Sequence, residues 1–295
     1  MTMEATGFAR HPSAAREGLR RLWYRVKGSP LTLVGAGIAL VVLLVIVAAP
    51  ILAPYPPDRI SLSARLAAPS LQHLFGTDEV GRDLFSRVLF GARASCGIAF
   101  AIVIISTVVG SIVGCLSGVV GGVVDTAIMR LMDVFLALPA LILAMALAAA
   151  LGPSLFNAML AVAVVRVPAY VRLARGQTLA LRNRTYVKAS RSFGASPAYL
   201  LRWHILPNAL SPIIVQATLD LGGTILTAAA LSFIGLGAQP PTSEWGSMVS
   251  SGRNYFLDQW WYITFPGLAI LVSAMGFNLL GDGLRDMLDP RLGGR

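Results

Sequence analysis

The segment TYVKASRSFGASPAYLLRWHILPN, residues 185–208, is a basic interruption in a largely apolar chain, and it contains no acidic residue. Its residues that carry or can carry positive charge are Lys188, Arg191, Arg202 and His204. Ser196 is a favourable N-cap and Pro197 suits the first position of a helix, so the segment predicts two short helices separated by a turn at Gly194. An exposed helix pair of this kind needs a partner, which is either the lipid surface or another protein.

The second of these helices is predicted over residues 198–206, with Pro207 closing it. Apolar and aromatic residues repeat along it at helical spacing and therefore share one side. These residues are Tyr199, Leu200, Trp203 and Leu206. We expect this side of the helix to contact the partner.

The composition on either side of this segment is that of a membrane protein. Of the 295 residues, 56% are hydrophobic and only 13% are charged, whereas a soluble domain has about 25% charged residues. The net charge of +10 comes from basic residues that flank apolar spans, without the interleaved aromatic residues of a nucleic-acid surface. Membrane topology therefore explains the charge better than nucleic-acid binding does.

Six apolar stretches are long enough to cross a bilayer. They are residues 31–53, 94–120, 125–151, 155–173, 209–235 and 260–280. They predict an all-α, polytopic membrane protein with six transmembrane helices. Five spans remain possible if the third and fourth stretches form a hairpin that does not fully cross.

The distribution of lysine and arginine predicts the orientation. The N-terminal segment 1–30 has six, the stretch from Arg172 to Arg202 has seven, and the tail has three. The loops at 54–92 and 236–258 have four and one, each alongside acidic residues. Because cytoplasmic loops carry the excess of basic residues, both termini, the loop 176–208 and the tail 284–295 are predicted to be cytoplasmic. The transmembrane core is then 94–283, and the two long loops lie outside.

Charged residues inside a membrane span are costly and are therefore candidates for function. Asp220 lies near the middle of the fifth span and Arg166 lies similarly deep in the fourth. Together with Gln216 they are the candidate lining of a translocation pathway, with Asp220 facing an ammonium group and Arg166 a carboxylate. Alternatively, the two charges pair with each other, or one of them faces a companion subunit.

Two smaller predictions concern the helices near these charges. Arg130 and Asp133 are three residues apart and are expected to form an ion pair on one helix face. Pro139 and Pro168 are expected to kink their helices.

The outer segment 73–93 combines apolar residues with charges of both signs, which suits docking of a soluble protein. Its candidate docking residues are Asp78, Glu79, Arg82, Asp83 and Arg87. Alternatively, the segment is a capping or re-entrant helix that plugs the mouth of the bundle.

The stretch YVKASRSFGASPAYLLRWHILPNAL resembles the cytoplasmic coupling loop of ABC importer permeases, with matching positions at Ala189, Gly194, Leu206 and Pro207. Further stretches resemble the dipeptide/oligopeptide branch of that family: HLFGTDEVGRDLFSRVLFGAR (73–93), IMRLMDVFLALPALIL (128–143), LSFIGLGAQPPTSEWGSMV (231–249) and FNLLGDGLRDMLDPRL (277–292). Within the branch, the motifs KGSPLT, LGPSLFNAMLA and SGRNYFLDQWWY look most like permeases for D,D-dipeptides of the D-alanyl-D-alanine type.

The resemblance implies a type I importer fold in a bacterial inner membrane, acting as one half of a permease heterodimer. It further implies two cytoplasmic ATPase subunits, which bind ATP and Mg, and a periplasmic peptide-binding protein. The residues implied to contact the ATPase are Lys188, Ala189, Ser190, Gly194, Ala195, Ser196, Tyr199, Leu200, Trp203, Leu206 and Pro207. Lys188 and Ser190 depart from the family pattern, which has glutamate and alanine there.

The chain itself has no G-x-x-x-x-G-K-[ST] motif, so we expect no ATPase site and no bound cofactor. No metal site is expected either, because the three histidines are widely scattered. A transporter driven by an ion gradient remains the rival class, although such proteins usually show internal repeats, and none is evident here. The cargo stays open between dipeptides, D,D-dipeptides, longer peptides, glutathione and nickel chelates.

Overall fold

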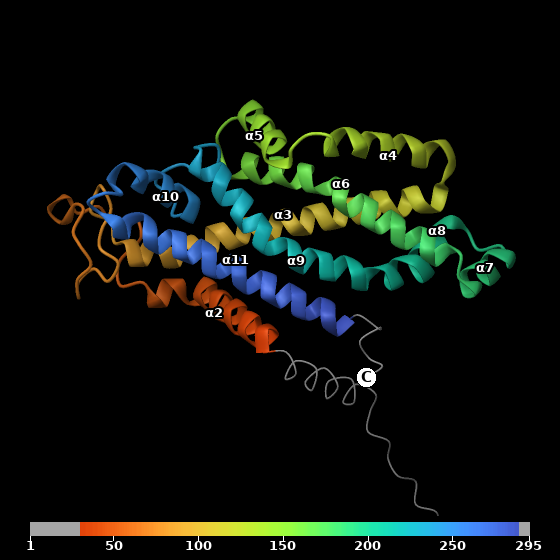
Figure 1. Ribbon diagram of the computed structural model, residues 1–295, viewed down its shortest axis with the longest axis horizontal. Coiled ribbons are helices and arrows are strands. Elements are labelled where there is room, and N and C mark those ends of the chain that lie inside the picture. The colour runs from red at the N-terminus through yellow and green to blue at the C-terminus, as the bar shows by residue number, and fades with distance from the viewer. Residues whose placement is uncertain (1–29, 289–295) are drawn as a thin grey trace, which may run out of the picture.

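The computed structural model describes residues 30–288, and within that range the chain is built from helices (Figure 1). They are α2 (Pro30–Leu52), α3 (Leu84–Val120), α4 (Gly122–Leu136), α5 (Ala140–Leu151), α6 (Leu155–Arg182), α7 (Thr185–Ser192), α8 (Pro197–Leu200), α9 (Leu206–Phe233), α10 (Trp245–Gly252) and α11 (Trp260–Leu288). Short 3-10 turns lie at Leu62–Ala64 and Arg253–Tyr255, and a π-helical turn lies at Leu201–Ile205. The predicted all-α class is confirmed.

Five of these helices, or six spans when the pair α4 and α5 is counted as one, are long and apolar enough to cross a membrane. This agrees with the six predicted spans. The third span, predicted as one stretch over 125–151, is instead broken, because α4 and α5 meet at 91°. Pro139 is the N-cap of α5, and a proline at that position cannot continue the preceding helix.

Helix α3 begins ten residues before the predicted start of the second span. The Asp83 side chain caps it by accepting a hydrogen bond from the backbone N–H of Ser86, so residues 84–93 belong to this helix. Its 37 residues give a length of about 55 Å, well beyond the ~30 Å of a hydrocarbon core. α3 therefore extends beyond a membrane crossing to the irregular segment 53–83. We call this segment, together with the first turn of α3 (84–87), the outer cap, because the distribution of basic residues predicts that it lies outside.

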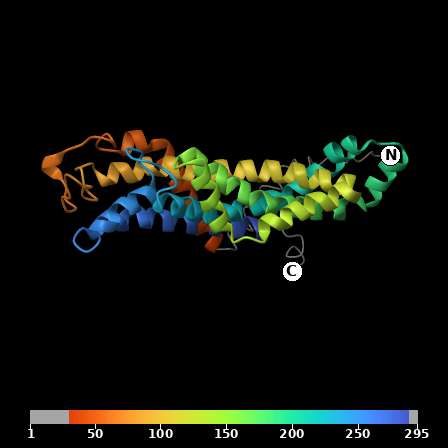
Figure 2. The ribbon, with the colours of Figure 1, turned by 90° about the horizontal axis from the view of Figure 1, so that it is seen from above.

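The outer cap and the pair α7–α8 lie at opposite ends of the elongated bundle (Figures 1 and 2). Helix α2 runs toward the cap and α11 runs away from it (Figure 1). The start of α2 and the end of α11 are therefore the ends of these helices that point away from the cap (Figure 1).

Three glycines on α3 allow the close packing of α3 against α6. A Cβ at Gly110 would lie 2.4 Å from the Tyr170 Cβ, and one at Gly114 would lie 2.3 Å from the carbonyl oxygen of Val171. At Gly118 it would lie 2.7 Å from Thr178 Cγ2. The spacing of four residues places all three glycines on one face, as in the small-residue interfaces of membrane helices.

Small residues also allow α2 to pack closely against α11. A Cβ at Gly35 would lie 2.6 Å from the Leu279 Cβ, and one at Gly276 would lie 2.3 Å from Ile38 Cγ2. The opposite side of α2 is exposed, with Val47 at 78% and Ile51 at 86%. This apolar exposure is what a lipid-facing helix requires.

The segment 236–258, predicted as a polar outer loop, folds back onto the bundle as α10. Trp245 is 3% exposed, and its indole N–H donates to the Val88 carbonyl of α3 at 2.9 Å. The Glu244 carboxylate caps α10 and also accepts a hydrogen bond from Ser95 Oγ on α3 at 3.0 Å. The polar composition of this segment suggested an exposed loop. Glu244 can nevertheless be buried, because its carboxylate accepts hydrogen bonds from within the bundle.

Replacing Trp245 with alanine should destabilise the outer half of the bundle. The change empties a core position and leaves the Val88 carbonyl without its donor, for an expected loss of about 3–5 kcal/mol. Thermal unfolding of the purified chain in detergent measures it. Trp260→Ala is the matched control, because Trp260 is 52% exposed; equal losses for the two variants would contradict the proposed packing.

Helix α4 is held to α6 by ion pairs. Arg175 donates two hydrogen bonds to the Asp125 carboxylate, at 2.5 and 2.6 Å. Asp133 pairs with Arg172 of α6, so the predicted pairing with Arg130 on the same helix is wrong for the described residues. The Arg172 guanidinium of α6 lies within ion-pair distance of the Asp133 carboxylate and supplies its partner from the neighbouring helix.

Candidate functional site

The pair α7–α8 with its following π turn, residues 185–205, forms the candidate coupling element. Gly194 ends the first helix with φ at +83°, a conformation that glycine adopts without strain. The Ser196 side chain accepts a hydrogen bond from the Tyr199 N–H, and Pro197 occupies the first turn. The predicted helix-turn-helix and its cap are therefore confirmed.

The predicted helix end at Pro207 is wrong, since the chain continues through it into α9. Proline has no N–H, and its ring crowds the carbonyl four residues earlier. The backbone avoids that clash by widening into a π turn, in which the Leu206 N–H donates to the Leu201 carbonyl, five residues back. The coupling element is thus continuous with α9, which enters the membrane region.

Three apolar side chains anchor the coupling element to the bundle: Val187 at 2% exposure, Leu200 at 5% and Ile205 at 1%. They pack with residues of α3 and α6, including Val119 and Leu181. Leu200 was predicted to share an outward side with Tyr199, and it instead faces inward. Leu206 also packs partly inside, against Ala209 and its neighbours.

The outward surface of the coupling element is aromatic and basic. Phe193 is 91% exposed, Trp203 59% and Tyr199 49%, and Lys188 is exposed beside them. The Arg202 guanidinium lies 5.4 Å from the centroid of the Trp203 ring. Phe193 was not among the predicted contact residues, although an aromatic residue directly before the turn glycine was a visible signal.

Some of the other predicted contact residues are exposed, and the rest pack within the coupling element. Ala189, Gly194, Ser196 and Pro207 are exposed, and Ala195 packs half-buried against the anchor residues. Ser190 Oγ lies 3.1 Å from His204 Nε2, which ties α7 to the π turn. The His204 ring also contacts the rings of Tyr186 and Tyr199, with centroids 5.9 and 5.7 Å away.

The candidate lining residues come together between α6 and α9. Arg166 Nη1 lies 3.2 Å from Asp220 Oδ1, and the two side chains are 21% and 19% exposed. Gln216 donates to the same carboxylate at 3.4 Å, and Arg166 donates to Thr227 Oγ1 at 3.4 Å. The sequence alternative in which these charges pair is thus the arrangement in this structure, with both groups still partly accessible.

Four of the five candidate docking residues are buried in the outer cap: Asp78, Arg82, Asp83 and Arg87 are between 0% and 8% exposed. Asp78 pairs with Arg82 at 2.5 Å and with Arg87 at 3.6 Å. Glu79 is half-buried and accepts a hydrogen bond from the Tyr262 hydroxyl of α11. Within this chain these charges hold the cap together and fasten it to α11.

The described residues thus form an all-α bundle of candidate membrane spans with a broken third span, an irregular cap at one end and an anchored basic helix pair at the other. The chain belongs to the family of binding-protein-dependent transport system inner membrane components, whose model matches residues 106–294. The N-terminal transmembrane domain of oligopeptide transport permease C matches residues 19–69.

Curated relatives cover nearly the whole chain. The probable D,D-dipeptide transport system permease protein DdpC of Escherichia coli K12 is 58% identical over 295 residues, which are 100% of this chain and 99% of that protein. The dipeptide transport system permease protein DppC of the same organism is 49% identical over 280 residues, 93% of each chain. The di/tripeptide transport system permease protein DppC of Pseudomonas aeruginosa UCBPP-PA14 is 46% identical over 93% of this chain and 92% of its own length.

The fold also matches a solved transporter. A chain of the MetNI methionine ABC transporter, in a structure of its inward-facing conformations, superposes with a TM-score of 0.56 at 20% identity. The match covers 70% of this chain and 98% of that one. The likeness confirms the predicted fold of an ABC importer permease.

Proposed function

We propose that this permease carries di- or oligopeptides, including D,D-dipeptides, through an importer that partner ATPases drive. The observation that supports this most is the full-length similarity to peptide permeases, together with a coupling element whose aromatic and basic surface has no partner within the described chain. Glutathione or a nickel chelate is the alternative cargo within the same branch.

The proposed assembly places the coupling element in the bacterial cytoplasm and the outer cap in the periplasm. Two cytoplasmic ATPases bind ATP and Mg, and one of them receives the coupling element. A similar second permease completes the pathway, and a periplasmic peptide-binding protein delivers the cargo. The excess of basic residues from Arg172 to Arg202 supports this orientation.

The continuity of the coupling element with α9 gives the proposed mechanism. Movement of the exposed surface is transmitted through the anchor residues Val187, Leu200 and Ile205 because packed side chains resist independent motion. The anchor residues pack against α6, which carries Arg166, and the π turn continues into α9, which carries Asp220, so displacement of the coupling element reaches both partners of the mid-membrane ion pair. The chain performs no covalent step in this scheme.

Reconstitution of the full transporter in proteoliposomes tests the proposal. Uptake of labelled D-alanyl-D-alanine should require ATP, the binding protein and both ATPases. Uptake by this chain alone on a proton or sodium gradient would assign it to the rival class of secondary transporters. Competition with L,L-dipeptides, glutathione and a nickel chelate identifies the cargo class.

The lining role proposed for Arg166 and Asp220 leads to a sharper prediction. Exchanging the charges, Arg166→Asp with Asp220→Arg, keeps an ion pair between α6 and α9 and should preserve assembly. Because the charges now face the wrong ends of a zwitterionic peptide, uptake should fall at least about tenfold, as loss of one charge-assisted contact implies.

The control for this exchange is the double variant Arg166→Gln with Asp220→Asn. It removes both charges together, so that no single charge is left without a partner. Assembly is followed by co-purification with the second permease. Normal uptake by the exchanged variant would mean that the ion pair only holds α6 and α9 together and does not contact the cargo.

The outer cap is proposed to form the docking surface for the binding protein. Its buried charges, Asp78, Arg82, Asp83 and Arg87, support that surface by fixing the backbone of the cap. Glu79, which is half-buried, remains the member of the set best placed for direct contact.

A further inference from the structure

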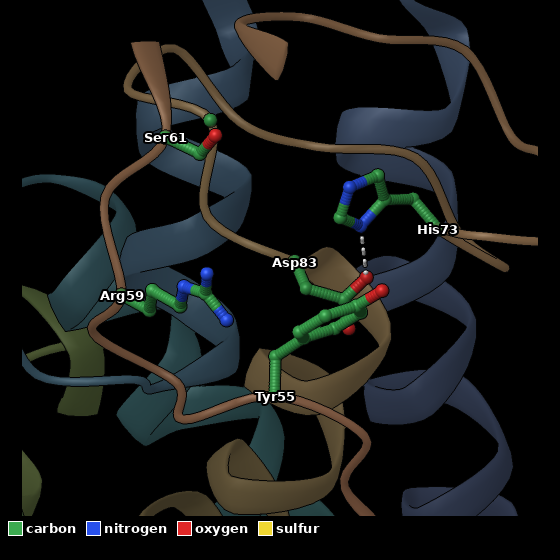
Figure 3. A pocket seen from close by; sticks show the side chains of 6 residues that line it. Tyr55, Arg59, Ser61, His73 and Asp83 are labelled. Carbon is green, nitrogen blue, oxygen red and sulfur yellow. Dashed lines mark hydrogen bonds and ion pairs between the residues drawn. The ribbon is translucent and has the colours of Figure 1, made fainter. Parts of the chain in front are cut away.

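The outer cap contains a pocket that neither the coupling element nor the mid-membrane pair explains. It has an empty volume of about 370 Å³, including its open mouth, and is lined by Tyr55, Arg59, Ser61, His73, Gly81 and Asp83 (Figure 3). Because much of this volume is open to solvent, the enclosed part suits only a ligand with few atoms.

Arg59 supplies an available positive charge. Its side chain is exposed and extends into the pocket (Figure 3), and no described carboxylate lies within ion-pair distance of it. By contrast, Arg82 and Arg87 of the same region are buried and paired. A guanidinium left free in a concave site is well suited to bind a carboxylate through two parallel hydrogen bonds.

Asp83 lines the same pocket but forms no ion pair with Arg59, because both of its carboxylate oxygens have other partners. One oxygen accepts hydrogen bonds from the backbone N–H and the hydroxyl of Ser86, at 2.8 and 2.7 Å. The other lies 2.9 Å from His73 Nδ1. An ionised carboxylate only accepts, so Nδ1 is the donor in this contact, and Nε2 is the ring nitrogen left for a ligand.

The pocket is held in shape by backbone contacts. Gly81 has φ at +78°, and a Cβ there would lie 1.8 Å from the Ser61 carbonyl oxygen. The Tyr55 N–H donates to Ser86 Oγ at 3.2 Å, and the Tyr55 and His73 rings lie 5.2 Å apart between centroids. A site that is already formed loses little conformational entropy when a ligand binds.

We propose that this pocket binds a small zwitterionic peptide, with its carboxylate on Arg59 and its ammonium group donating to His73 Nε2. The acidic side chain of a docked protein would use only the first of these contacts, whereas a free dipeptide carries both charges. The choice of ligand rests on the proposed function. The pocket is then a binding site for cargo at the outer surface, separate from the Arg166–Asp220 pair.

Binding of D-alanyl-D-alanine to the full chain in nanodiscs, without ATP or ATPases, tests this proposal by saturation-transfer NMR. The Arg59→Gln variant should bind about tenfold more weakly, and the C-terminal amide of the dipeptide should lose a similar factor on the unmodified chain. Arg65→Gln is the matched control, since Arg65 is an exposed arginine of the same cap outside the pocket, and its binding should not change.

Equal binding by the Arg59→Gln variant and the unmodified chain would overturn the proposal, because any remaining peptide would then sit elsewhere, including at the mid-membrane pair. Equal binding of the amide would also overturn it. Since the assay needs no transport, its failure leaves ATP-driven uptake untouched, and a failure of uptake leaves the pocket measurement valid.

Discussion

Replacing Gly114 with leucine should prevent α3 and α6 from packing. A Cβ at this position would lie 2.3 Å from the carbonyl oxygen of Val171 and 3.0 Å from the Ala174 Cβ. Because the nearest atom is backbone, no side-chain rotation relieves the clash, and the two helices must separate. We expect a loss on the order of 3 kcal/mol or more, seen as loss of the monodisperse peak in size-exclusion chromatography of the fluorescently tagged chain.

Gly97→Leu provides the matched control. Gly97 is also on α3, but it is exposed and has nothing within 4 Å of its Cβ position. It changes helix propensity and side-chain size in the same way as Gly114→Leu does. If both variants elute and unfold like the unmodified chain, the close contact between α3 and α6 does not stabilise the fold.

The sequence was sufficient to predict the helical class and the approximate position of each span, because long apolar stretches have few alternatives in a bilayer. It predicted a kink at Pro139 but not the full break between α4 and α5, since a proline within an apolar stretch is compatible with either. The glycine row at 110, 114 and 118 was visible as a repeat of small residues, yet the helix it would contact cannot be deduced from spacing alone.

The candidate sites show a similar division. The turn at Gly194 and the cap at Ser196 depend on local chemistry, and both were predicted correctly. The inward direction of Leu200 depends on how the coupling element sits against α3 and α6, which is a tertiary property. The charges of the outer cap were predicted to face a partner, whereas four of them are buried and pair with one another or with His73, because the burial of a charged segment against the bundle is a tertiary property that composition does not show.

Replacing Phe193 with alanine should uncouple the transporter without unfolding the permease. Phe193 is the most exposed aromatic side chain of the coupling element, at 91%, so its removal creates no cavity in this chain. Exposed aromatic anchors that become buried in a complex commonly contribute 2 kcal/mol or more to binding. We therefore expect ATP-driven uptake and co-purification with the ATPase subunits to fall more than about tenfold.

Phe156→Ala separates this effect from the general loss of an exposed aromatic residue. Phe156 is 61% exposed at the start of α6, distant in sequence from the coupling element, and its variant should keep the ATPase subunits. Retention of both ATPase binding and uptake by Phe193→Ala would mean that the ATPase binds another part of the exposed surface. Trp203 and Tyr199 would then be the next residues to replace. All three aromatic residues belong to the element that continues into α9, so a partner that holds any of them can move this helix and, with it, Asp220, which lies across from Arg166.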